Sequence, residues 1–151
     1  MITEIQNDIF AIDADAYAHG INNLGTMGAG IASQFKKKYP SMFEQYQKMC
    51  QSKELNLGDV FFYRSQKKPS VINIVTQNNL HSADLSAVEK GFEKIISNYK
   101  VWAVKKIAIP EIGCGLGNLL WKNVDDLIKQ YFENSEIELV VCHKKQTSLF
   151  F

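Results

Sequence analysis

Hydrophobic and polar positions along this chain follow two periods in turn, and this alternation predicts strands that alternate with helices. Short runs rich in β-branched and aromatic residues, bounded by turn residues, predict strands. Apolar positions three or four residues apart predict amphipathic helices, as in the series from Leu85 to Tyr99. The expected strands are residues 2–5, 16–21, 60–63, 71–75, 106–109 and 137–142, and the expected helices are residues 30–38, 41–48, 85–99 and 121–132.

Residues that start and stop helices support this assignment. Pro40 ends the first helix, and Ser41 and Asp84 are expected to cap the next two. The alternation predicts an α/β fold, a three-layer α/β/α sandwich around a mixed, largely parallel central sheet. Because the chain has no internal repeat, low-complexity stretch or linker, residues 1–151 are expected to form one domain. Residues 146–151 are expected to be a short C-terminal tail that either docks on the body or meets a partner.

Two glycine-punctuated turns, each between an apolar run and a helix, carry the clearest chemical signal. The first is Asn22-Asn23-Leu24-Gly25-Thr26-Met27-Gly28-Ala29-Gly30, and the second is Pro110-Glu111-Ile112-Gly113-Cys114-Gly115-Leu116-Gly117-Asn118. Glycine lets backbone N–H groups approach an anion closely, and the helix behind each turn adds donors and a favourable dipole. Two such turns in one domain predict a clamp on a diphosphate. Neither the Gly-Lys-Ser/Thr end of a Walker A loop nor a dinucleotide fingerprint at the first strand is present.

Charge and cysteine content narrow the function classes. The formal net charge is +1 and the basic runs are short and scattered, so a nucleic-acid-binding domain is disfavoured. No apolar run approaches the ~20 residues of a membrane span, and the first ten residues lack the apolar core of a signal peptide. Three widely separated cysteines predict neither a disulfide framework nor a zinc site. We therefore expect a reduced, cytoplasmic protein that holds no metal.

Several segments match one known family in order and spacing. They are Asn7-Asp8-Ile9-Phe10, the run from His19 through the first glycine turn to Ala32, and the run from Pro110 to Leu116 followed by Trp121. Through them the chain resembles the macrodomain (Appr-1''-p processing) family over residues 3–141. It is most similar to the subgroup that contains the DNA- and glutamate-ADP-ribose hydrolases and the yeast-type ADP-ribose 1''-phosphate phosphatase. The resemblance implies that ADP-ribose or a derivative is the ligand, that an ADP-ribosylated macromolecule is a further partner, and that no cofactor is needed.

The resemblance also implies a role for each residue of the binding site. Asp8 would accept a hydrogen bond from the adenine amino group, beside the Ile9 backbone. The implied phosphate and ribose contacts are Gly28, Ala29, Gly30 and Ile31 for one phosphate; Gly113, Cys114, Gly115, Leu116 and Gly117 for the other phosphate and the distal ribose; Asn22, Asn23 and Met27 for the riboses; and Gly25, Thr76 and Asn118 to complete the set.

Each of these roles has a structural alternative. Asp8 can be a capping or turn residue, and one of the two asparagines can be a turn former, because asparagine tolerates such geometry without a ligand. Met27 can simply fill space in the loop. Trp121 is expected to anchor the second turn to the core rather than contact the ligand.

The chain departs from the family at the residues that would carry catalysis. Where the members that remove ADP-ribose from glutamate or DNA have a lysine, this chain has Gln77, whose amide cannot form a Schiff base. Gly117 stands where one such hydrolase has an acid. His19 matches a histidine of the yeast-type phosphatase and suits acid–base chemistry near neutral pH, but its place in a strand slightly favours a satisfied structural histidine. His81 lies in a polar segment that either covers the distal ribose or is simply solvated.

Two function classes therefore remain open. One is an enzyme that hydrolyses an ADP-ribose derivative, with His19 and Gln77 as the candidate catalytic residues. Loss of the lysine does not exclude this class, since many macrodomains let a water bound to the diphosphate do the chemistry. The other is a non-catalytic reader, sensor or sponge for ADP-ribose or a related nucleotide. Both need the same pocket.

Overall fold

The described part of the chain forms one mixed sheet of six strands. The computed structural model describes residues 1–67 and 69–144. The strands are β1 (Ile2–Gln6), β2 (Ala16–Asn22), β3 (Val60–Tyr63), β4 (Ser70–Gln77), β5 (Lys106–Pro110) and β6 (Glu138–His143). Their order is β1-β6-β5-β2-β4-β3, and neighbours are parallel except for the antiparallel edge pair β3 and β4. The mixed, largely parallel sheet predicted from the sequence is confirmed.

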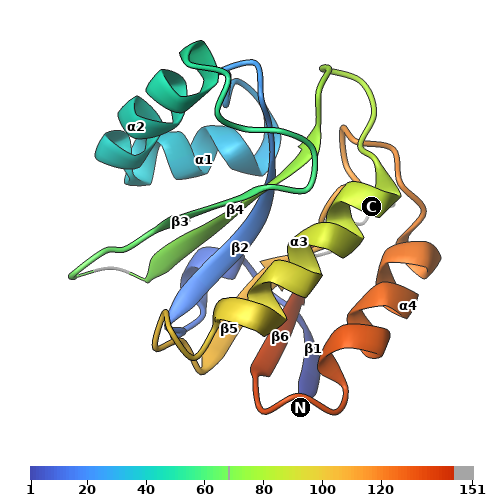
Figure 1. Cartoon of the computed structure of the whole chain (residues 1–151). Helices are drawn as coiled ribbons and strands as arrows, with labels where there is room; N and C mark the ends of the chain where they lie inside the picture. The colour runs from blue at the N-terminus through green and yellow to red at the C-terminus, as the bar shows by residue number, and fades with distance from the viewer. Residues whose placement is uncertain (68, 145–151) are drawn as a thin grey trace, which may run out of the picture.

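Helices cover both faces of the sheet. On one face lie α1 (Gly30–Lys38) and α2 (Pro40–Gln51), and on the other lie α3 (Leu85–Asn98) and α4 (Trp121–Phe132) (Figure 1). A short 3₁₀ helix, η1 (Ile9–Ala11), follows β1. The three-layer α/β/α sandwich is thus confirmed, and the predicted elements agree with the observed ones to within a few residues at each end.

The strand side chains divide into two core layers because successive residues point to opposite faces. Ile72, Ile74 and Ile107 pack with α3 and α4, whereas Val71 and Val75 pack with α1 and α2. Every residue of β4 from Ser70 to Thr76 is buried, as expected for a strand that is covered on both faces. Three polar side chains of this strand, Ser70, Asn73 and Thr76, are buried with the apolar ones.

One predicted helix cap is confirmed and one is wrong. Asp84 caps α3, since its Oδ1 accepts hydrogen bonds from the backbone N–H groups of Ser86 at 2.8 Å and Ala87 at 3.3 Å. Ser41 does not cap α2, which begins one residue earlier, at Pro40, after Tyr39. Proline suits the first helical position because its fixed φ is already helical and its missing N–H would have no partner there.

None of the helices in residues 1–67 and 69–144 has the length and apolar character needed to cross a bilayer. The predicted C-terminal tail, residues 146–151, lies outside the described residues.

Candidate functional site

The carboxyl ends of the parallel strands meet at one edge of the sheet, which is at the top of Figure 1. In open α/β sheets, ligands bind outside this edge, where loops lead into helices. Both glycine turns lie here. We call residues 23–29, between β2 and α1, the first glycine loop, and residues 111–120, between β5 and α4, the second glycine loop. The connection from β4 to α3, residues 78–84, lies at the same edge, and Asp8 follows β1 after Asn7.

The second glycine loop is closed on itself and pinned to the neighbouring connection. Gly113 has a φ of 75°, a conformation that favours glycine, and its carbonyl accepts a hydrogen bond from Leu119 N at 2.9 Å. A Cβ at Gly117 would lie 2.6 Å from Gly113 O and 2.8 Å from the Ala83 Cβ, so no larger residue fits. Gly117 O accepts a hydrogen bond from Ala83 N at 2.8 Å, which ties the loop to the β4–α3 connection. The loop therefore has one preferred shape before any ligand arrives.

Asn118 makes a second tie between the same two segments. Its Nδ2 donates to the His81 carbonyl at 2.9 Å, and its φ is 62°. The His81 side chain itself is exposed. Asn118 thus holds the far end of the second glycine loop in place, and no more direct ligand role for it is visible.

The two asparagines before the first glycine loop use their side chains to shape it. Asn22 Nδ2 donates to Thr26 O and Oγ1, both at 3.0 Å, and Asn22 Oδ1 accepts from Leu24 N at 2.9 Å. The Tyr46 hydroxyl lies 2.6 Å from the same Oδ1. Asn23 Nδ2 donates to Leu55 O at 3.2 Å, which fastens the loop to the segment before β3. The turn-forming alternative therefore accounts for both side chains.

Each of the two loops has a glycine beside open space, and the loops lie next to each other. A Cβ at either Gly28 or Gly115 would meet nothing within 4 Å. Ala29 precedes α1 and makes no side-chain cap, so the first N–H groups of α1, which begin at Gly30 and Ile31, lack a capping side chain and can bind an anion. Leu116 of the second glycine loop is 61% exposed and reaches within 3.8 Å of where a Cβ of Gly30 would be, so the two loops lie side by side.

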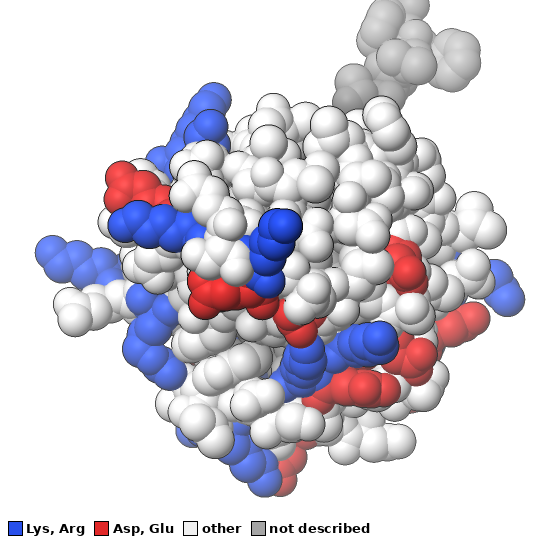
Figure 2. Space-filling view, turned by 45° about the horizontal axis from the view of Figure 1, so that its top comes forward, with Lys and Arg blue, Asp and Glu red and all other residues white. Residues whose placement is uncertain are grey.

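The rim of this space is formed by uncharged residues. Figure 2 shows charged side chains on the left, lower and right parts of this view, whereas its upper central part is white. In the sequence, residues 22–30, 76–83 and 112–120 contain no Lys, Arg, Asp or Glu. An anion held between these loops would therefore be bound by backbone N–H groups and the α1 dipole rather than by their side chains.

Three further predicted ligand residues lie in or beside the core. Met27 is 1% exposed and packs with the α1–α2 side, which fits the space-filling alternative. Thr76 is buried, with its Oγ1 3.4 Å from Ile21 O. Gly25 has a φ of 87°, and its carbonyl accepts from Gln47 Nε2 at 3.3 Å. Met27 and Thr76 are therefore packed inside the protein, and Gly25 joins the first glycine loop to α2.

Asp8 caps η1 and leaves its other carboxylate oxygen exposed. Its Oδ1 accepts a hydrogen bond from Phe10 N at 3.0 Å and so caps η1, while the residue as a whole is exposed. Among the described residues, no hydrogen bond to its Oδ2 is made. The neighbouring Ile9 is buried in the α1–α2 layer, which fixes the backbone at this point. A carboxylate oxygen is thus held at the sheet edge, available to a donor from outside.

The candidate nucleophiles and bases are constrained by their surroundings. Gln77 is half-buried, and its Nε2 donates to Asn79 O at 2.7 Å, within its own loop. Burial, together with the nearby charge of Glu111, raises the pKa of the Cys114 thiol to about 11. Cys114 is therefore protonated at neutral pH and is not a nucleophile there.

His19 lies inside the protein, away from this edge. Its side chain is 0% exposed, its ring stacks on Phe35 with centroids 3.9 Å apart, and its Nε2 lies 2.6 Å from Asn73 Oδ1. Burial lowers the pKa of His19 to about 4, although the hydrogen bond to Asn73 opposes this shift. A general acid or base must reach the substrate, and this buried position does not support that role.

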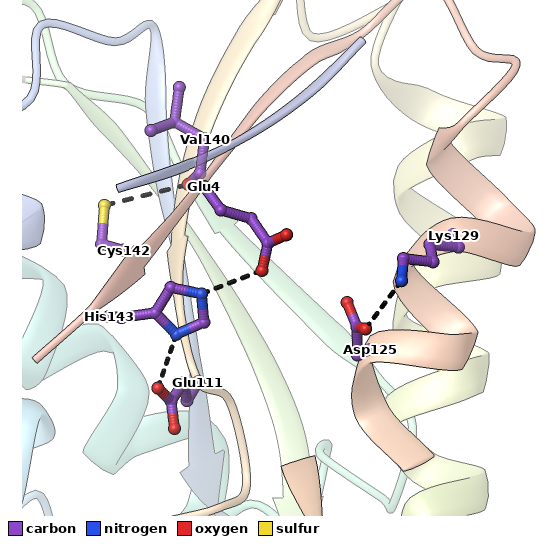
Figure 3. Close-up of polar contacts among 7 residues, drawn as sticks. All are labelled: Glu4, Glu111, Asp125, Lys129, Val140, Cys142 and His143. Atoms are coloured by element: carbon purple, nitrogen blue, oxygen red, sulfur yellow. Dashed lines mark hydrogen bonds and ion pairs between the residues drawn. The ribbon is translucent and has the colours of Figure 1, made fainter. Parts of the chain in front are cut away.

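Three side chains that the sequence analysis missed meet at the same edge. His143, the last residue of β6, places Nδ1 2.6 Å from Glu111 Oε2 and Nε2 3.0 Å from Glu4 Oε1 (Figure 3). Glu4 comes from β1, and Glu111 is the first residue of the second glycine loop. The three residues are far apart in the sequence, so only the pairing of β1 with β6 and of β6 with β5 could have revealed the cluster. Within the described ranges, no group of three or more His, Cys, Asp or Glu residues is arranged to hold a metal ion.

Comparison with known proteins assigns this fold to a family. The family model described as Macro domain matches residues 18–128. The chain belongs to the Macro domain family. This Macro domain is 32% identical over 141 residues to the ADP-ribose glycohydrolase OARD1 of Homo sapiens, an alignment that covers 93% of this chain and 90% of the human protein. It is 29% identical over 146 residues to the DNA ADP-ribosyl glycohydrolase of Mycobacterium tuberculosis, covering 93% of this chain and 42% of that protein.

A solved structure with the same fold contains the ligand that the sequence resemblance implies. Thermosipho africanus DarTG in complex with ADP-ribose superposes with a TM-score of 0.88 at 25% identity, covering 97% of this chain and 43% of that chain. The chain spans about two fifths of the length of the first DNA ADP-ribosyl glycohydrolase relatives that it matches.

Proposed function

We propose that this Macro domain binds ADP-ribose and hydrolyses an ADP-ribose derivative, either the 1''-phosphate or an ADP-ribosyl conjugate of a macromolecule. The observation that carries the proposal is the pair of glycine loops at the carboxyl edge, which lie side by side at Gly30 and Leu116 and have open space at Gly28 and Gly115. The printed names of the relatives, ADP-ribose glycohydrolase and DNA ADP-ribosyl glycohydrolase, and the ADP-ribose in the Thermosipho africanus structure support the same ligand.

The proposed pose follows from the positions of the donors and acceptors. The free Asp8 oxygen accepts a hydrogen bond from the adenine amino group. The N–H groups of Gly28, Ala29, Gly30 and Ile31 bind one phosphate at the α1 N-terminus, where the helix dipole favours an anion. The amides of residues 113–117 bind the other phosphate and orient the distal ribose. In this pose the scissile bond at the distal ribose lies beside the second glycine loop.

The chemistry in this proposal is attack by water on the bond to the distal ribose or on its phosphate. The protein contributes orientation and stabilisation of developing negative charge by the N–H groups of the second glycine loop. Because neither Cys114 nor Gln77 is a nucleophile here, no covalent enzyme intermediate is proposed. Gln77 would have to release Asn79 O before its amide could contact the distal ribose.

A non-catalytic reader or sponge is the second candidate, and two observations favour it. The lysine of the hydrolase subgroup is replaced by Gln77, whose amide is engaged in its own loop, and His19 is buried in the core. Both functions are proposed for a single, reduced, cytoplasmic domain that needs no cofactor.

The first test is calorimetric titration of the protein with ADP-ribose. Asp8→Asn is the matched variant: its amide oxygen can still cap η1, but its NH₂ group replaces the acceptor offered to adenine. We expect a loss of about tenfold in affinity, the size of one charge-assisted hydrogen bond, with unchanged thermal stability. Equal affinity in the variant would remove Asp8 from the site, and no binding by the wild type would reject the proposed function.

Turnover is tested on the same preparation. Phosphate release from ADP-ribose 1''-phosphate is measured beside ADP-ribose release from modified protein and from modified DNA. Turnover of any one substrate assigns the enzyme class and its substrate, whereas tight binding without turnover assigns the reader. Gln77→Lys, compared with Gln77→Met, then asks whether an amine at this position creates or increases cleavage of a conjugate.

A further inference from the structure

The cluster of Glu4, Glu111 and His143 joins three separate parts of the protein at the edge of the site. His143 ends β6, Glu4 belongs to β1, and Glu111 starts the second glycine loop. The imidazole lies between the two carboxylates, with contacts of 2.6 Å to Glu111 and 3.0 Å to Glu4 (Figure 3). Its side chain is 21% exposed, and the ring of Trp121 meets it edge to face with centroids 5.2 Å apart.

This geometry requires a doubly protonated ring. A neutral imidazole has one N–H and one bare nitrogen, so it can donate to only one of two carboxylates. Both nitrogens here lie within hydrogen-bond distance of a carboxylate oxygen, and only the imidazolium satisfies both contacts. Burial lowers the pKa of His143, but the hydrogen bonds and charges of Glu111 and Glu4 outweigh it, and the net effect is a raised pKa.

The other charged groups around the cluster are on α4 and at the end of β6. Asp125 and Lys129 of α4 form an ion pair of 3.0 Å on the side of Glu4 (Figure 3). Lys144 follows His143 and is exposed. The neighbouring Cys142 packs on the opposite face of the sheet, in the α1–α2 layer. The two glutamates are thus the charged groups that contact the imidazole directly.

The second glycine loop is anchored at both ends. At its start, Ile112 is buried in the core and Gly113 O accepts from Leu119 N at 2.9 Å, and Glu111 adds a side-chain contact to β6. Gly117 and Asn118 bind the β4–α3 connection through Ala83 N and His81 O. At the near end, Glu111 binds His143 at 2.6 Å. Loss of that contact would remove the side-chain tie between Glu111 and β6 and loosen the placement of the amides of residues 113–115, while buried Ile112 keeps the loop attached to the core.

We propose that His143 is a positioning residue that holds the second glycine loop through Glu111, with Glu4 as counter-ligand, and thereby makes ADP-ribose binding dependent on pH. This inference rests on the proposed function for its ligand. When the imidazolium loses a proton, one bare nitrogen faces a carboxylate and one contact breaks. Protonation therefore favours the loop shape that binds the diphosphate.

The test is the affinity for ADP-ribose measured by calorimetry between about pH 6 and about pH 9, a range that spans the titration of a histidine with a raised pKa. We expect wild-type affinity to fall about tenfold across this range, the size of one lost charge-assisted hydrogen bond. His143→Gln should bind weakly at every pH. Glu4→Gln should bind tightly at every pH, because a neutral imidazole can donate to Glu111 and accept from the new amide.

The matched control is Glu138→Gln, which removes a carboxylate from the same strand without touching His143. It should keep the wild-type pH profile. If the role of His143 were purely structural, His143→Gln would lower stability and affinity, but Glu4→Gln would keep the wild-type pH profile. Wild-type affinity that does not vary with pH, or a Glu4→Gln variant that keeps the wild-type pH dependence, would overturn the proposal.

A second readout does not depend on the ligand. In a Trp102→Phe background, Trp121 fluorescence reports the protonation of the adjacent His143, and hydrogen exchange reports the protection of the amides of residues 113–118. We expect a fluorescence titration that is lost in His143→Gln, and faster exchange of these amides in that variant than in the background protein at the same pH. If ADP-ribose does not bind but these signals appear, the proposed function fails and the loop positioning stands. If ADP-ribose binds and these signals are absent, the positioning proposal alone fails.

Discussion

Lowering the pH from about 7.5 to about 5 should destabilise this protein by about 2 kcal/mol through one buried group, His19. The orientation of Asn73 fixes the tautomer. Its Nδ2 donates to Phe61 O at 3.1 Å and lies 3.4 Å from the Met42 sulfur, so its Oδ1 accepts from His19 Nε2. The bare nitrogen is therefore Nδ1, which is buried and has no hydrogen-bond partner among the described residues. A proton added there would be an uncompensated charge in the core.

The sign and the size follow from the two pKa values. Burial lowers the pKa of His19 to about 4 in the folded protein, while the unfolded chain has the ordinary value of 6.5. Between these values the unfolded state binds a proton that the folded state does not, so stability falls as the pH falls through this window. Each unit of difference is worth about 1.4 kcal/mol, which gives about 2 kcal/mol at about pH 5 and about 3 kcal/mol below pH 4.

The assay is urea unfolding at fixed pH values, followed by tryptophan fluorescence and by circular dichroism. His19→Gln removes the titrating group. Between about pH 7.5 and about pH 5, the fall in its free energy of unfolding should therefore be smaller than the wild-type fall by about 2 kcal/mol. His81→Gln, which alters an exposed histidine, is the matched control and should keep the wild-type profile. Equal losses in the wild type and His19→Gln would refute the reasoning, since they would mean that the folded protein accommodates the proton.

Three further tests, two by substitution and one by a thiol reaction, examine the local geometry. Gly117→Ala should weaken ADP-ribose binding by at least about tenfold because its Cβ would lie 2.6 Å from a backbone carbonyl, whereas Gly115→Ala, with no neighbour within 4 Å, should leave thermal stability unchanged. Loss of stability in Gly115→Ala would contradict the open space assigned there. Cys114, whose pKa is raised to about 11, should react with iodoacetamide at pH 7.5 far more slowly than a free thiol, as followed by mass spectrometry of the peptide. Asp15→Ala should lower the free energy of unfolding by about 1–2 kcal/mol, because its Oδ2 accepts from two backbone N–H groups at 2.8 and 2.9 Å, while Asp13→Ala should have little effect in the same urea titration.

The fold could be predicted from the sequence because its elements are set by local patterns. The run from Leu85 to Tyr99 has helical spacing, and β4 is a short run of β-branched residues between turn residues, as the structure confirms. The cap predicted at Ser41 is wrong, and the reason is also local. Serine is a common cap, but the proline before it already supplies a helical φ, so the helix starts there.

The site could be predicted only in the part that is local along the chain. The glycine loops are contiguous segments, and their place at the carboxyl edge follows from the parallel sheet. Burial was harder to predict. His19 lies on a strand that is covered on both faces, and the sequence gives no sign that Phe35 covers its ring. The cluster around His143 joins the first strand, the last strand and a loop, so it required the order β1-β6-β5, which the alternation of elements does not determine.

Affinity and turnover depend on different parts of this site. In the proposed site the anion is bound by backbone N–H groups, whose direction depends on the shape of the loops and not on the identity of most side chains. That shape is secured by contacts away from the ligand, such as Asn22 to Thr26, Gly117 to Ala83 and Glu111 to His143. Gln77, the candidate catalytic residue, takes part in none of these contacts, since its Nε2 donates to Asn79 O. Binding can therefore be retained while the rate of any hydrolysis rests on how well these loops orient a water. For this reason pH should act on affinity through His143 even if the chain proves to be a reader.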